Sequence, residues 1–349
     1  MSPVHEQLDA TLQRFAHLEV LVVGDVMLDE YLLGEVDRVS PEAPVPIVAV
    51  EREVRALGGA GNVVRNLVAL GARARLCSVV GDDDEGRRIV DLLKELGVDT
   101  SGIVVDAARR TTRKTRIVAR DQQMIRADRE DVEALGDDTR AALEDRVRAS
   151  LRGTDGAALV DYGKGVLAPD AACRLVAMCG EAGIDVAVDP KGHLDAYRGV
   201  RLVKPNAAEA AALLGEPEAS PAASGHGAHA WARRLGERLP GADVALTLGG
   251  EGMVVLEAGS KGAPELVPTA SLDVYDVQGA GDTSLAALWL SRLAGASLVD
   301  AALVANAASG VAVSKVGTAT ASRDEVRERL ARVLAAGGAR EEDDDGGSR

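Results

Sequence analysis

The chain has 349 residues, of which 46% are hydrophobic and 27% are charged, and its formal net charge at pH 7 is −15. This length and composition predict one large domain with a small appended piece, because a chain of this size can bury a sizeable core. The acidic balance argues against nucleic acid as a partner, since binding a polyanion requires a basic face.

Short apolar runs bounded by turns alternate with helical stretches along most of the chain. We expect buried strands at residues 20–23, 76–80, 157–160, 186–188, 202–203 and 244–248, and helices at 60–70, 85–96, 137–151, 169–182, 207–214, 228–239, 281–293 and 322–335. Near-continuous apolar strands separated by helices are typical of a parallel sheet covered on both faces. The sequence therefore predicts a three-layer α/β/α domain with a mostly parallel central sheet.

Two segments break this alternation and predict a small separate β-sheet that acts as a lid over a cleft. They are residues 34–54, which contain three prolines, and residues 109–126, where β-branched and charged residues interleave. The second segment has seven basic residues and one acidic residue. A charged edge strand that discourages aggregation and a site for a substrate phosphate explain this composition equally well.

The remaining composition indicates neither a membrane span nor a metal site. No run of eighteen apolar residues occurs and residues 1–15 lack an apolar secretory core, so we expect a cytoplasmic protein. The three cysteines form no CxxC pair, and the weak His226-x-x-His229 spacing favours loop or core roles over zinc. We place the domain at residues 1–335 and expect residues 336–349 to form an acidic, disordered tail.

Polar residues follow the first predicted strand and precede the next helix. Asp25 and Asp29 come just after residues 20–23, where open α/β folds bind ligands, and such carboxylates can hold sugar hydroxyls. Asp25 can equally serve as a turn or cap residue. Gly58, Gly59 and Asn62 lead into the helix at 60–70, where glycines admit a polyol, although helix capping explains them nearly as well.

Two lysines and a capping pattern follow later strands. Lys164 and Lys191 each lie beside glycine at the end of an apolar strand, so either can contact a phosphate. Asn206 and Glu209 have the spacing of a capping box at the start of a helix, which is the safer interpretation for Glu209 taken alone.

The next strand ends in the run Thr247-Leu248-Gly249-Gly250-Glu251-Gly252. Thr247, Gly249 and Gly252 can hold nucleotide phosphates through side-chain and backbone donors, although an isolated motif of this kind is more often a hairpin turn. Its value lies in its position, because the ends of parallel strands converge on one edge of a sheet.

The most informative run is DVQGAGD at residues 276–282, which opens directly into an apolar helix. Gly279, Ala280 and Gly281 let the backbone approach a polyphosphate, and the free N–H groups of a helix N-terminus attract anions. Asp282 then lies where an acceptor hydroxyl would meet the γ-phosphate of ATP. The run therefore indicates phosphoryl transfer to an alcohol.

Together these motifs resemble the ribokinase-like (PfkB) carbohydrate kinases from about residue 18 to about residue 334. Within that family the chain is most similar to kinases that phosphorylate D-glycero-D-manno-heptose 7-phosphate at the anomeric oxygen. The resemblance is carried by GDVMLD at 24–29, SPEAPVP at 40–46, QQMIR at 122–126, DYGKG at 161–165, DPKG at 189–192 and VYDV at 274–277. No HxGH motif of a nucleotidyltransferase follows, so we expect the kinase to stand alone.

The resemblance also implies a set of roles. The product would be heptose 1,7-bisphosphate, feeding nucleotide-activated heptose, and the lid would bind a second subunit in a homodimer. The roles implied are a catalytic base at Asp282, an anion hole at Gly279, Ala280 and Gly281, sugar contacts at Asp25, Asp29, Gly58, Gly59 and Asn62, 7-phosphate contacts at Arg126, Lys164 and Lys191, support of ATP and Mg²⁺ at Asn206 and Glu209, nucleotide contacts at Thr247, Gly249, Gly252 and Asn306, and a monovalent cation such as K⁺ beside Asp276.

Two alternatives stay open at this point. The first is a ribokinase-like kinase for another sugar or sugar phosphate, such as ribose or fructose 6-phosphate. The second is a sugar-binding homologue that has lost turnover, which the intact Asp282 and the glycines before it disfavour.

Overall fold

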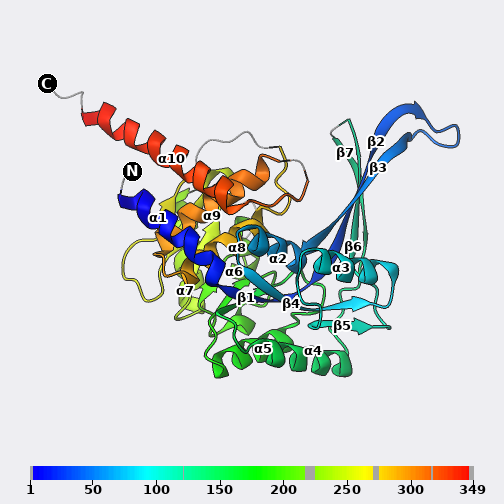
Figure 1. Cartoon of the computed structure of the whole chain (residues 1–349), viewed down its shortest axis with the longest axis horizontal. Coiled ribbons are helices and arrows are strands. Elements are labelled where there is room, and N and C mark those ends of the chain that lie inside the picture. Colours follow the sequence, from blue (N-terminus) through cyan, green and yellow to red (C-terminus); the bar gives the residue numbers. More distant parts are fainter. Residues whose placement is uncertain (1–2, 121, 217–224, 270–274, 316, 346–349) are drawn as a thin grey trace.

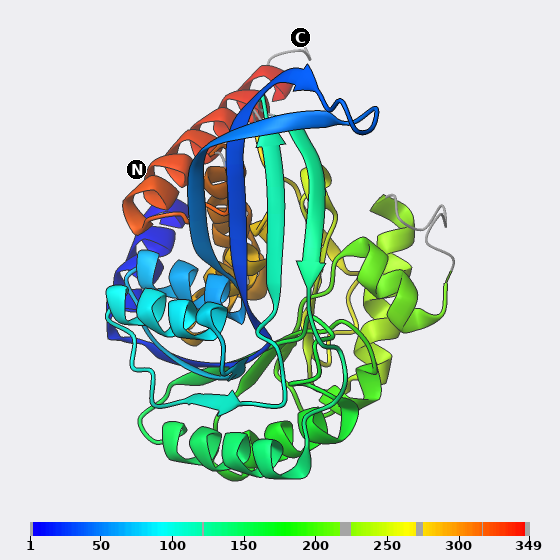
Figure 2. The ribbon, with the colours of Figure 1, turned by 90° about the vertical axis from the view of Figure 1, so that its right-hand side faces the viewer.

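The computed structural model describes residues 3–120, 122–216, 225–269, 275–315 and 317–345 (Figure 1). A large sheet with helices on both faces forms the body of the molecule, and a second, smaller sheet projects from it (Figures 1 and 2). The two predicted parts of the fold, the α/β body and the β lid, are therefore both confirmed.

The central sheet has nine strands within the described ranges, in the order β13-β12-β11-β10-β9-β8-β1-β4-β5. Their bounds are β1 Glu19–Gly24, β4 Arg73–Gly81, β5 Ile103–Asp106, β8 Gly156–Val160, β9 Val186–Asp189, β10 Leu202–Val203, β11 Asp243–Thr247, β12 Met253–Leu256 and β13 Glu265–Val267. Neighbours from β5 to β11 run parallel, and β12 and β13 add antiparallel strands at one edge. Parallel neighbours need a crossover, which is why helices separate most of these strands.

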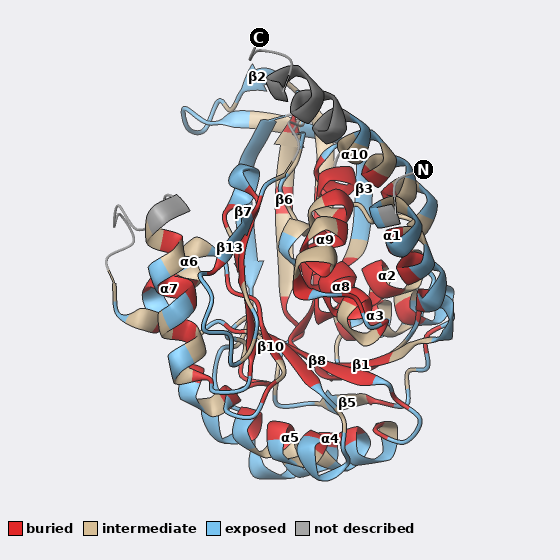
Figure 3. Ribbon diagram, turned by 90° about the vertical axis from the view of Figure 1, so that its left-hand side faces the viewer, coloured by how far each residue is buried: buried red, intermediate tan, exposed pale blue. Residues whose placement is uncertain are grey.

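Helices cover both faces of the central sheet (Figure 3). Their bounds are α1 Pro3–Arg14, α2 Ala60–Ala69, α3 Asp84–Glu95, α4 Asp137–Ser150, α5 Pro169–Glu181, α6 Ala207–Leu214, α7 Gly225–Arg238, α8 Ala280–Leu293, α9 Leu298–Val313 and α10 Arg323–Asp345, with short 3₁₀ turns at Phe15–His17, Leu194–Tyr197 and Gly249–Glu251. Alternate residues of β1 serve two cores, because successive side chains of a strand point to opposite faces. Val20 and Val22 pack in the core that contains α2, α8 and α9, whereas Leu21 and Val23 pack in the core that contains α4, α5 and α7.

The lid is a four-stranded sheet in the order β3-β2-β6-β7. Its strands are β2 Val26–Val39, β3 Pro46–Gly59, β6 Arg113–Ala119 and β7 Gln122–Arg129. β2 pairs antiparallel with β3 and parallel with β6, and the far ends of β2 and β3 extend beyond the other two strands (Figure 2). β2 and β3 together extend beyond the predicted segment 34–54 at both ends. β6 and β7 begin later than the predicted segment 109–126 and end later than it.

The lid begins one residue after the central sheet ends, because β1 ends at Gly24 and β2 begins at Val26. On the return, β3 ends at Gly59 and α2 begins at Ala60. Asp29 and Gly58 therefore belong to lid strands, although the sequence predicts them in loops. Residues 26–31 at the base of β2 are all buried. The burial of β2 therefore does not mark where the central sheet ends and the lid begins.

Several elements were not predicted. These are the strands β5, β12 and β13, which have only three or four residues each, and the N-terminal α1, in which only Leu8 and Leu12 are buried among the apolar side chains of the core. α10 continues past Ala335 to Asp345, so the division at residue 335 stays a prediction. In the described part of the chain, no helix combines the length and the apolar character that crossing a membrane requires.

Candidate active site

The candidate site lies where the carboxyl ends of β1, β8 and β9 face the N-terminus of α8 and the base of the lid. Gly279 precedes α8 with a φ of 74°. A Cβ at this position would lie 2.6 Å from Nδ2 of Asn62, so only glycine fits both the backbone conformation and the space. No side-chain hydrogen bond caps α8 at Gly279, although the N–H of Ala280 donates to the carbonyl of Val277 at 3.3 Å. The anion hole at Gly279, Ala280 and Gly281 stays a prediction.

Asp282 occupies the first turn of α8 and is 3% exposed. Nδ2 of Asn62 donates to its Oδ2 at 2.8 Å, and the hydroxyl of Tyr162 donates to its Oδ1 at 2.8 Å. Burial raises the pKa of Asp282 to about 7, against the two hydrogen bonds and the nearby Lys204, which lower it. A carboxyl group with a pKa near neutrality is suited to take up a proton during a reaction.

A buried ion pair lies beside the first turn of α8. Nζ of Lys204 contacts Oδ2 of Asp189 at 2.8 Å, and the Lys204 side chain is 2% exposed. Burial alone would lower the pKa of Lys204, but the attraction of Asp189 outweighs it and the pKa is raised, so the ammonium stays charged. The same Nζ lies 3.9 Å from the position that a Cβ on Gly281 would take. A fixed positive charge therefore accompanies the first turn of α8.

Asp25 anchors the loop that follows β8. Its carboxylate accepts hydrogen bonds from the backbone N–H groups of Tyr162, Lys164 and Val166 at 2.8, 3.0 and 3.1 Å. Asp25 is 2% exposed, and burial raises its pKa although the three N–H groups oppose this. This geometry gives Asp25 the structural role that the sequence left open beside sugar binding.

The base of the lid contributes Asp29, which is 5% exposed. Nη1 of Arg116 donates to its Oδ1 at 2.7 Å, and the Arg116 guanidinium lies 5.3 Å from the centre of the Tyr31 ring. A Cβ on Gly58 would lie 2.3 Å from Oδ2 of Asp29, so the carboxylate needs glycine at this position. The hydroxyl of Tyr31 donates to Oε1 of Gln278 at 2.8 Å and links the lid to the loop before α8.

Asn62 and Arg65 on α2 form a chain of hydrogen bonds that leads to Asp282. Nη1 of Arg65 donates to Oδ1 of Asn62 at 3.2 Å and to the carbonyl of Thr318 at 2.9 Å. The first bond orients the amide so that its Nδ2 faces Asp282. Gly59 lies at the junction between β3 and α2, next to this network.

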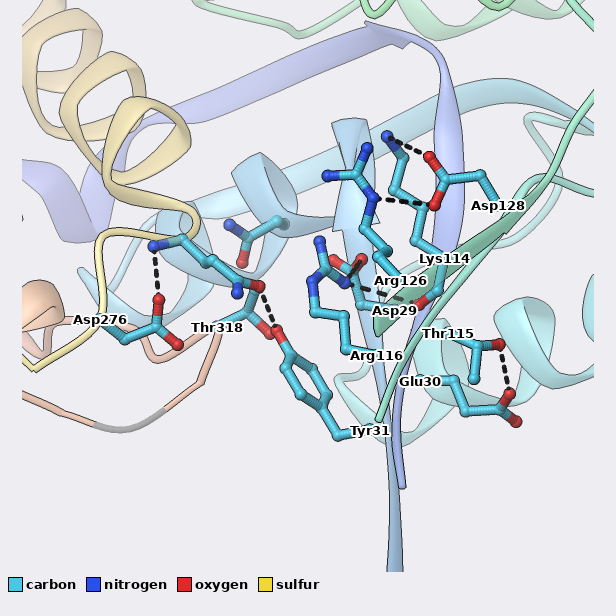
Figure 4. Close-up of polar contacts among 12 residues, drawn as sticks. Asp29, Glu30, Tyr31, Lys114, Thr115, Arg116, Arg126, Asp128, Asp276 and Thr318 are labelled. Carbon is cyan, nitrogen blue, oxygen red and sulfur yellow. Dashed lines mark hydrogen bonds and ion pairs between the residues drawn. The ribbon is translucent and has the colours of Figure 1, made fainter. Parts of the chain in front are cut away.

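Three cations of the inner face of the lid, Lys114, Arg116 and Arg126, together with Lys164 of the loop after β8, form a group that is here called the lid basic cluster. Arg116 of β6 lies opposite Arg126 of β7, and Lys114 is two residues before Arg116, so these side chains share one face of the sheet. Figure 4 shows Lys114, Arg116 and Arg126 beside Asp29, with Glu30 and Thr115 on the other face. Burial, with repulsion from Lys164 and Arg126, lowers the pKa of Lys114 despite the opposing pull of Asp128 and Glu130.

Acidic side chains partly neutralise this cluster. Nε of Arg126 contacts Oδ1 of Asp128 at 2.9 Å, and Nζ of Lys164 contacts Oε1 of Glu130 at 2.7 Å. Lys191, predicted with Arg126 and Lys164 as a phosphate contact, pairs instead with Glu209 at 3.4 Å and has a half-exposed side chain. The structure thus groups Arg126 with Lys164 near Lys114 and places Lys191 beside Glu209.

A cavity of about 310 Å³ lies on the other side of the α8 N-terminus. It is lined by Asn206, Thr247, Gly249, Gly250, Gly252, Thr269, Val277, Ala280, Gly281, Ser284, Asn306, Ser309, Gly310 and Val313. Five of the six residues predicted to contact or support ATP, all except Glu209, line it together with Ala280 and Gly281 of the predicted anion hole. Asn306 is held in place because its Nδ2 donates to the carbonyl of Val267 at 2.9 Å.

Glu209 and Asp276 both have local structural partners. Glu209 forms a capping box with Asn206, each side chain accepting from the other residue's backbone N–H at 2.9 Å. Asp276 accepts from the N–H groups of Gln278 and Gly317 at 2.9 and 3.2 Å, and so links the loop before α8 to the segment after α9 (Figure 4). Among the residues that the structure describes, no group of three or more His, Cys, Asp or Glu side chains could hold a metal ion.

Sequence reasoning missed five residues of this site: Tyr162, Lys204, Arg65, Lys114 and Arg116. Tyr162 lies in the DYGKG motif two residues before Lys164, and Lys204 follows the predicted strand at 202–203; a polar residue within two positions of the end of an apolar strand is the signal that marks both. Lys114 and Arg116 lie in the segment noted for its basic charge, but only the pairing of β6 with β7 shows which of its cations share a face.

Comparisons with known proteins agree with this geometry. The sequence model of the pfkB family carbohydrate kinases matches residues 18–325. The bifunctional protein HldE of Pelobacter propionicus is 41% identical over 330 residues, covering 93% of this chain and 66% of that protein. The HldE protein of Caulobacter vibrioides is 46% identical over 307 residues, covering 87% and 62%. The chain thus spans slightly less than two thirds of the length of these curated relatives.

Solved structures show the same fold. Phosphofructokinase-2 from Escherichia coli, in complex with potassium, superposes with a TM-score of 0.74 at 24% identity and covers 91% of this chain and 99% of its own. Arabidopsis thaliana ribokinase, complexed with ribose and ATP, has a TM-score of 0.69 at 20% identity and covers 90% and 98%. From the family match, the relatives and the fold together, this chain belongs to the pfkB family of carbohydrate kinases and is an ATP-dependent sugar kinase.

Proposed function

We propose that this kinase phosphorylates O1 of D-glycero-D-manno-heptose 7-phosphate, giving heptose 1,7-bisphosphate. The observation that carries the proposal is the lid basic cluster, which faces the cleft at the base of the lid and suits a phosphorylated sugar better than a neutral one. The heptose-kinase motifs at residues 24–29, 40–46 and 161–165 and the similarity to HldE proteins support the same substrate.

In this proposal the sugar lies between Asp282 and the lid. Asp29 and Asn62 hold its hydroxyl groups, and Lys114, Arg126 and Lys164 receive the 7-phosphate, whose charge replaces that of Asp128 and Glu130 as their partner. Arg116 holds Asp29 in place at 2.7 Å. Lys191 belongs to the ATP side of the site in this arrangement, because it pairs with Glu209.

ATP occupies the cavity of about 310 Å³ with its γ-phosphate toward the first turn of α8. Asp282 accepts the proton of the anomeric hydroxyl as O1 attacks the γ-phosphorus, and ADP leaves in line. Lys204, next to Gly281, stabilises the negative charge of the transferring group together with the backbone N–H groups. An anomeric hydroxyl is more acidic than an ordinary alcohol, which suits a carboxylate base.

The cation requirements follow from the donors present. Mg²⁺ usually binds through one or two carboxylates, water and substrate phosphates rather than in a protein cage, which fits a site where Glu209 and Asn206 are the donors at the edge of the cavity. When bound, Mg²⁺ neutralises charge on the phosphates. A monovalent cation beside Asp276 stays a prediction, supported by the potassium complex of the E. coli relative in fold.

We also propose that the lid forms the contact of a homodimer. The far ends of β2 and β3 carry exposed apolar side chains, among them Val39 at 67%, Val45 at 50% and Val50 at 51% exposed. Exposed apolar groups of this kind mark interaction surfaces when they lie together. Sedimentation of the wild type against a Val39→Asp, Val50→Asp double variant tests this, because the variant should sediment as a monomer.

The acceptor is tested by comparing heptose 7-phosphate with unphosphorylated heptose, fructose 6-phosphate, ribose and adenosine. We expect ADP release with heptose 7-phosphate to exceed that with heptose by at least about 100-fold in kcat/KM, since the charge-assisted contacts to Lys114, Arg126 and Lys164 are lost with the phosphate. Phosphorus NMR of the product should show the new phosphate at C1. Turnover only with another acceptor would support kinase activity but contradict the proposed substrate. No ADP release with any of the five compounds would support a non-catalytic role.

A further inference from the structure

Hydrogen bonds to two aspartates, Asp25 and Asp161, hold the start of the loop between β8 and α5 in place. Asp25 accepts from the N–H groups of Tyr162, Lys164 and Val166, as described above. Asp161 accepts from the N–H of Gly163 at 2.8 Å. Because the backbone on both sides of Tyr162 is tied to these carboxylates, its side chain is presented from a fixed point.

From that point the hydroxyl of Tyr162 reaches Asp282. It donates to Oδ1 at 2.8 Å, while Asn62, itself oriented by Arg65, donates to Oδ2 from α2 on the other side. Two donors from opposite walls fix both the rotamer and the plane of the carboxylate. Burial, then the negative charge of Asp282, raises the pKa of Tyr162 well above its ordinary value, so the phenol stays protonated and keeps donating.

We propose that Tyr162 is a positioning residue for the catalytic base: its hydroxyl holds the Asp282 carboxylate in the orientation that meets the acceptor and stabilises its ionised form. The proposal rests on the proposed role of Asp282 as base. During transfer the proton moves from the acceptor hydroxyl to Asp282, the bond from O1 to the γ-phosphorus forms, and the bond to the leaving oxygen of ADP breaks. Tyr162 gives up no proton in this step.

Other charged groups also act on Asp282 and must be kept constant in a test. Asp189 raises its pKa, Lys204 lowers it, and Arg65 faces it from α2. Tyr162→Phe changes none of these groups and removes a single oxygen atom. Tyr197→Phe is the matched control, because it removes the same atom from a buried tyrosine of the same loop system, whose hydroxyl bonds to Asp161 and not to Asp282.

The first measurement is the pH dependence of kcat/KM, which reports the ionisation of the free enzyme. Asp282 must be ionised to act, so activity rises with pH through its pKa of about 7. Losing a donor to the carboxylate raises that pKa, and we expect the acid limb of Tyr162→Phe to move up by about one pH unit. The limb of Tyr197→Phe should stay in place. Replacing Tyr162 by 3-fluorotyrosine, a stronger donor, should move the limb down.

The second measurement needs no substrate. Titration of the Asp282 carboxyl carbon by NMR in aspartate-labelled protein, assigned with Asp282→Asn, should show the same upward shift in Tyr162→Phe. An unchanged titration, or a loss of activity that is equal at every pH and shared by Tyr197→Phe, would overturn the proposal. Failure of the wild type to phosphorylate any acceptor would instead overturn the proposed function and leave the titration result standing.

Discussion

The two walls of the proposed site are the N-terminus of α8, here the α8 wall, and the lid. The Arg116–Asp29 pair at the base of the lid is buried, but the Arg126–Asp128 pair of β7 holds its charges differently from the α8 wall. At the N-terminus of α8, Asp282 and Lys204 are buried, each with short contacts to fixed partners. On the lid, the side chain of Arg126 is 49% exposed and its partner Asp128 belongs to the same strand, two residues away. Buried charges interact strongly and reorganise little, whereas exposed pairs exchange partners at small energetic expense.

This contrast suits the two tasks of a kinase site. Groups that stabilise a transition state work best when they are already in place, because no reorganisation is then needed at the moment of reaction. Groups that bind and release a charged substrate must break the ion pairs that they form in its absence. The α8 wall therefore has the properties of the reacting centre, and the lid those of a substrate-binding surface.

The largest expected effect is on the α8 wall. Asp282→Asn removes the proton acceptor while leaving the shape of the side chain, so kcat should fall by roughly 10³-fold. Binding of heptose 7-phosphate, measured by calorimetry in the absence of ATP, should change little. A variant that keeps more than a tenth of wild-type turnover would show that Asp282 is not the base.

A second test compares buried and exposed ion pairs directly. Lys204→Met leaves Asp189 buried without its partner, so the free energy of unfolding should fall by about 3 kcal/mol. Arg126→Ala breaks a half-exposed pair on the lid, and the fall should stay below about 1 kcal/mol. Urea unfolding of both variants measures this difference, and equal losses would remove the contrast between the two walls.

Stability should also depend on pH through Asp282. Burial raises its pKa from 3.8 to about 7, so the folded state binds the proton more tightly than the unfolded state. The resulting stability is full below pH 3.8 and is lost as the pH rises through 7. Asp282→Asn should therefore stabilise the protein more at pH 8 than at pH 5, by about 2 kcal/mol. Urea unfolding at the two pH values checks this, and an equal gain at both would contradict it.

The smallest expected effect is on the lid. Lys114→Met removes one cation of the lid basic cluster, so KM for heptose 7-phosphate should rise about tenfold with kcat nearly unchanged. Arg120→Ala is the control, because Arg120 is another cation of the lid segment but lies outside the lid basic cluster and pairs with Glu35 and Asp37. Steady-state kinetics at low and moderate salt should separate the two variants. A fall in kcat for Lys114→Met without a change in KM would assign Lys114 to the α8 wall instead.

Local patterns were enough to predict much of the molecule. The strands of the central sheet are short, apolar and bounded by turns, because they are buried on both faces, and that pattern is readable without any knowledge of pairing. The glycine-rich turn before α8 and the capping box of α6 are also local, since each depends on residues a few positions apart. Thr247, Gly249 and Gly252, which line the cavity beside α8, were singled out from such a turn, because it ends a strand at the edge where parallel strands converge.

Contacts between distant segments were not predictable in this way. Asp25 was predicted as a sugar contact on its position after a strand, but its three partners come from a loop more than 130 residues later. Lys204 and Asp189 meet because β9 and β10 are neighbours, and Tyr162 meets Asp282 because β8 ends opposite α8.

The sequence by itself determined the α/β class, the lid and the family, and it singled out Asp282 as the candidate catalytic base, because each depends on patterns within a short stretch of chain. Only the tertiary structure decided which groups surround that carboxylate, which lid cations share a face, and that Lys191 lies with Glu209 rather than with Arg126. The physical reason is that burial and charge pairing depend on distances in space, which the order of residues along the chain does not contain.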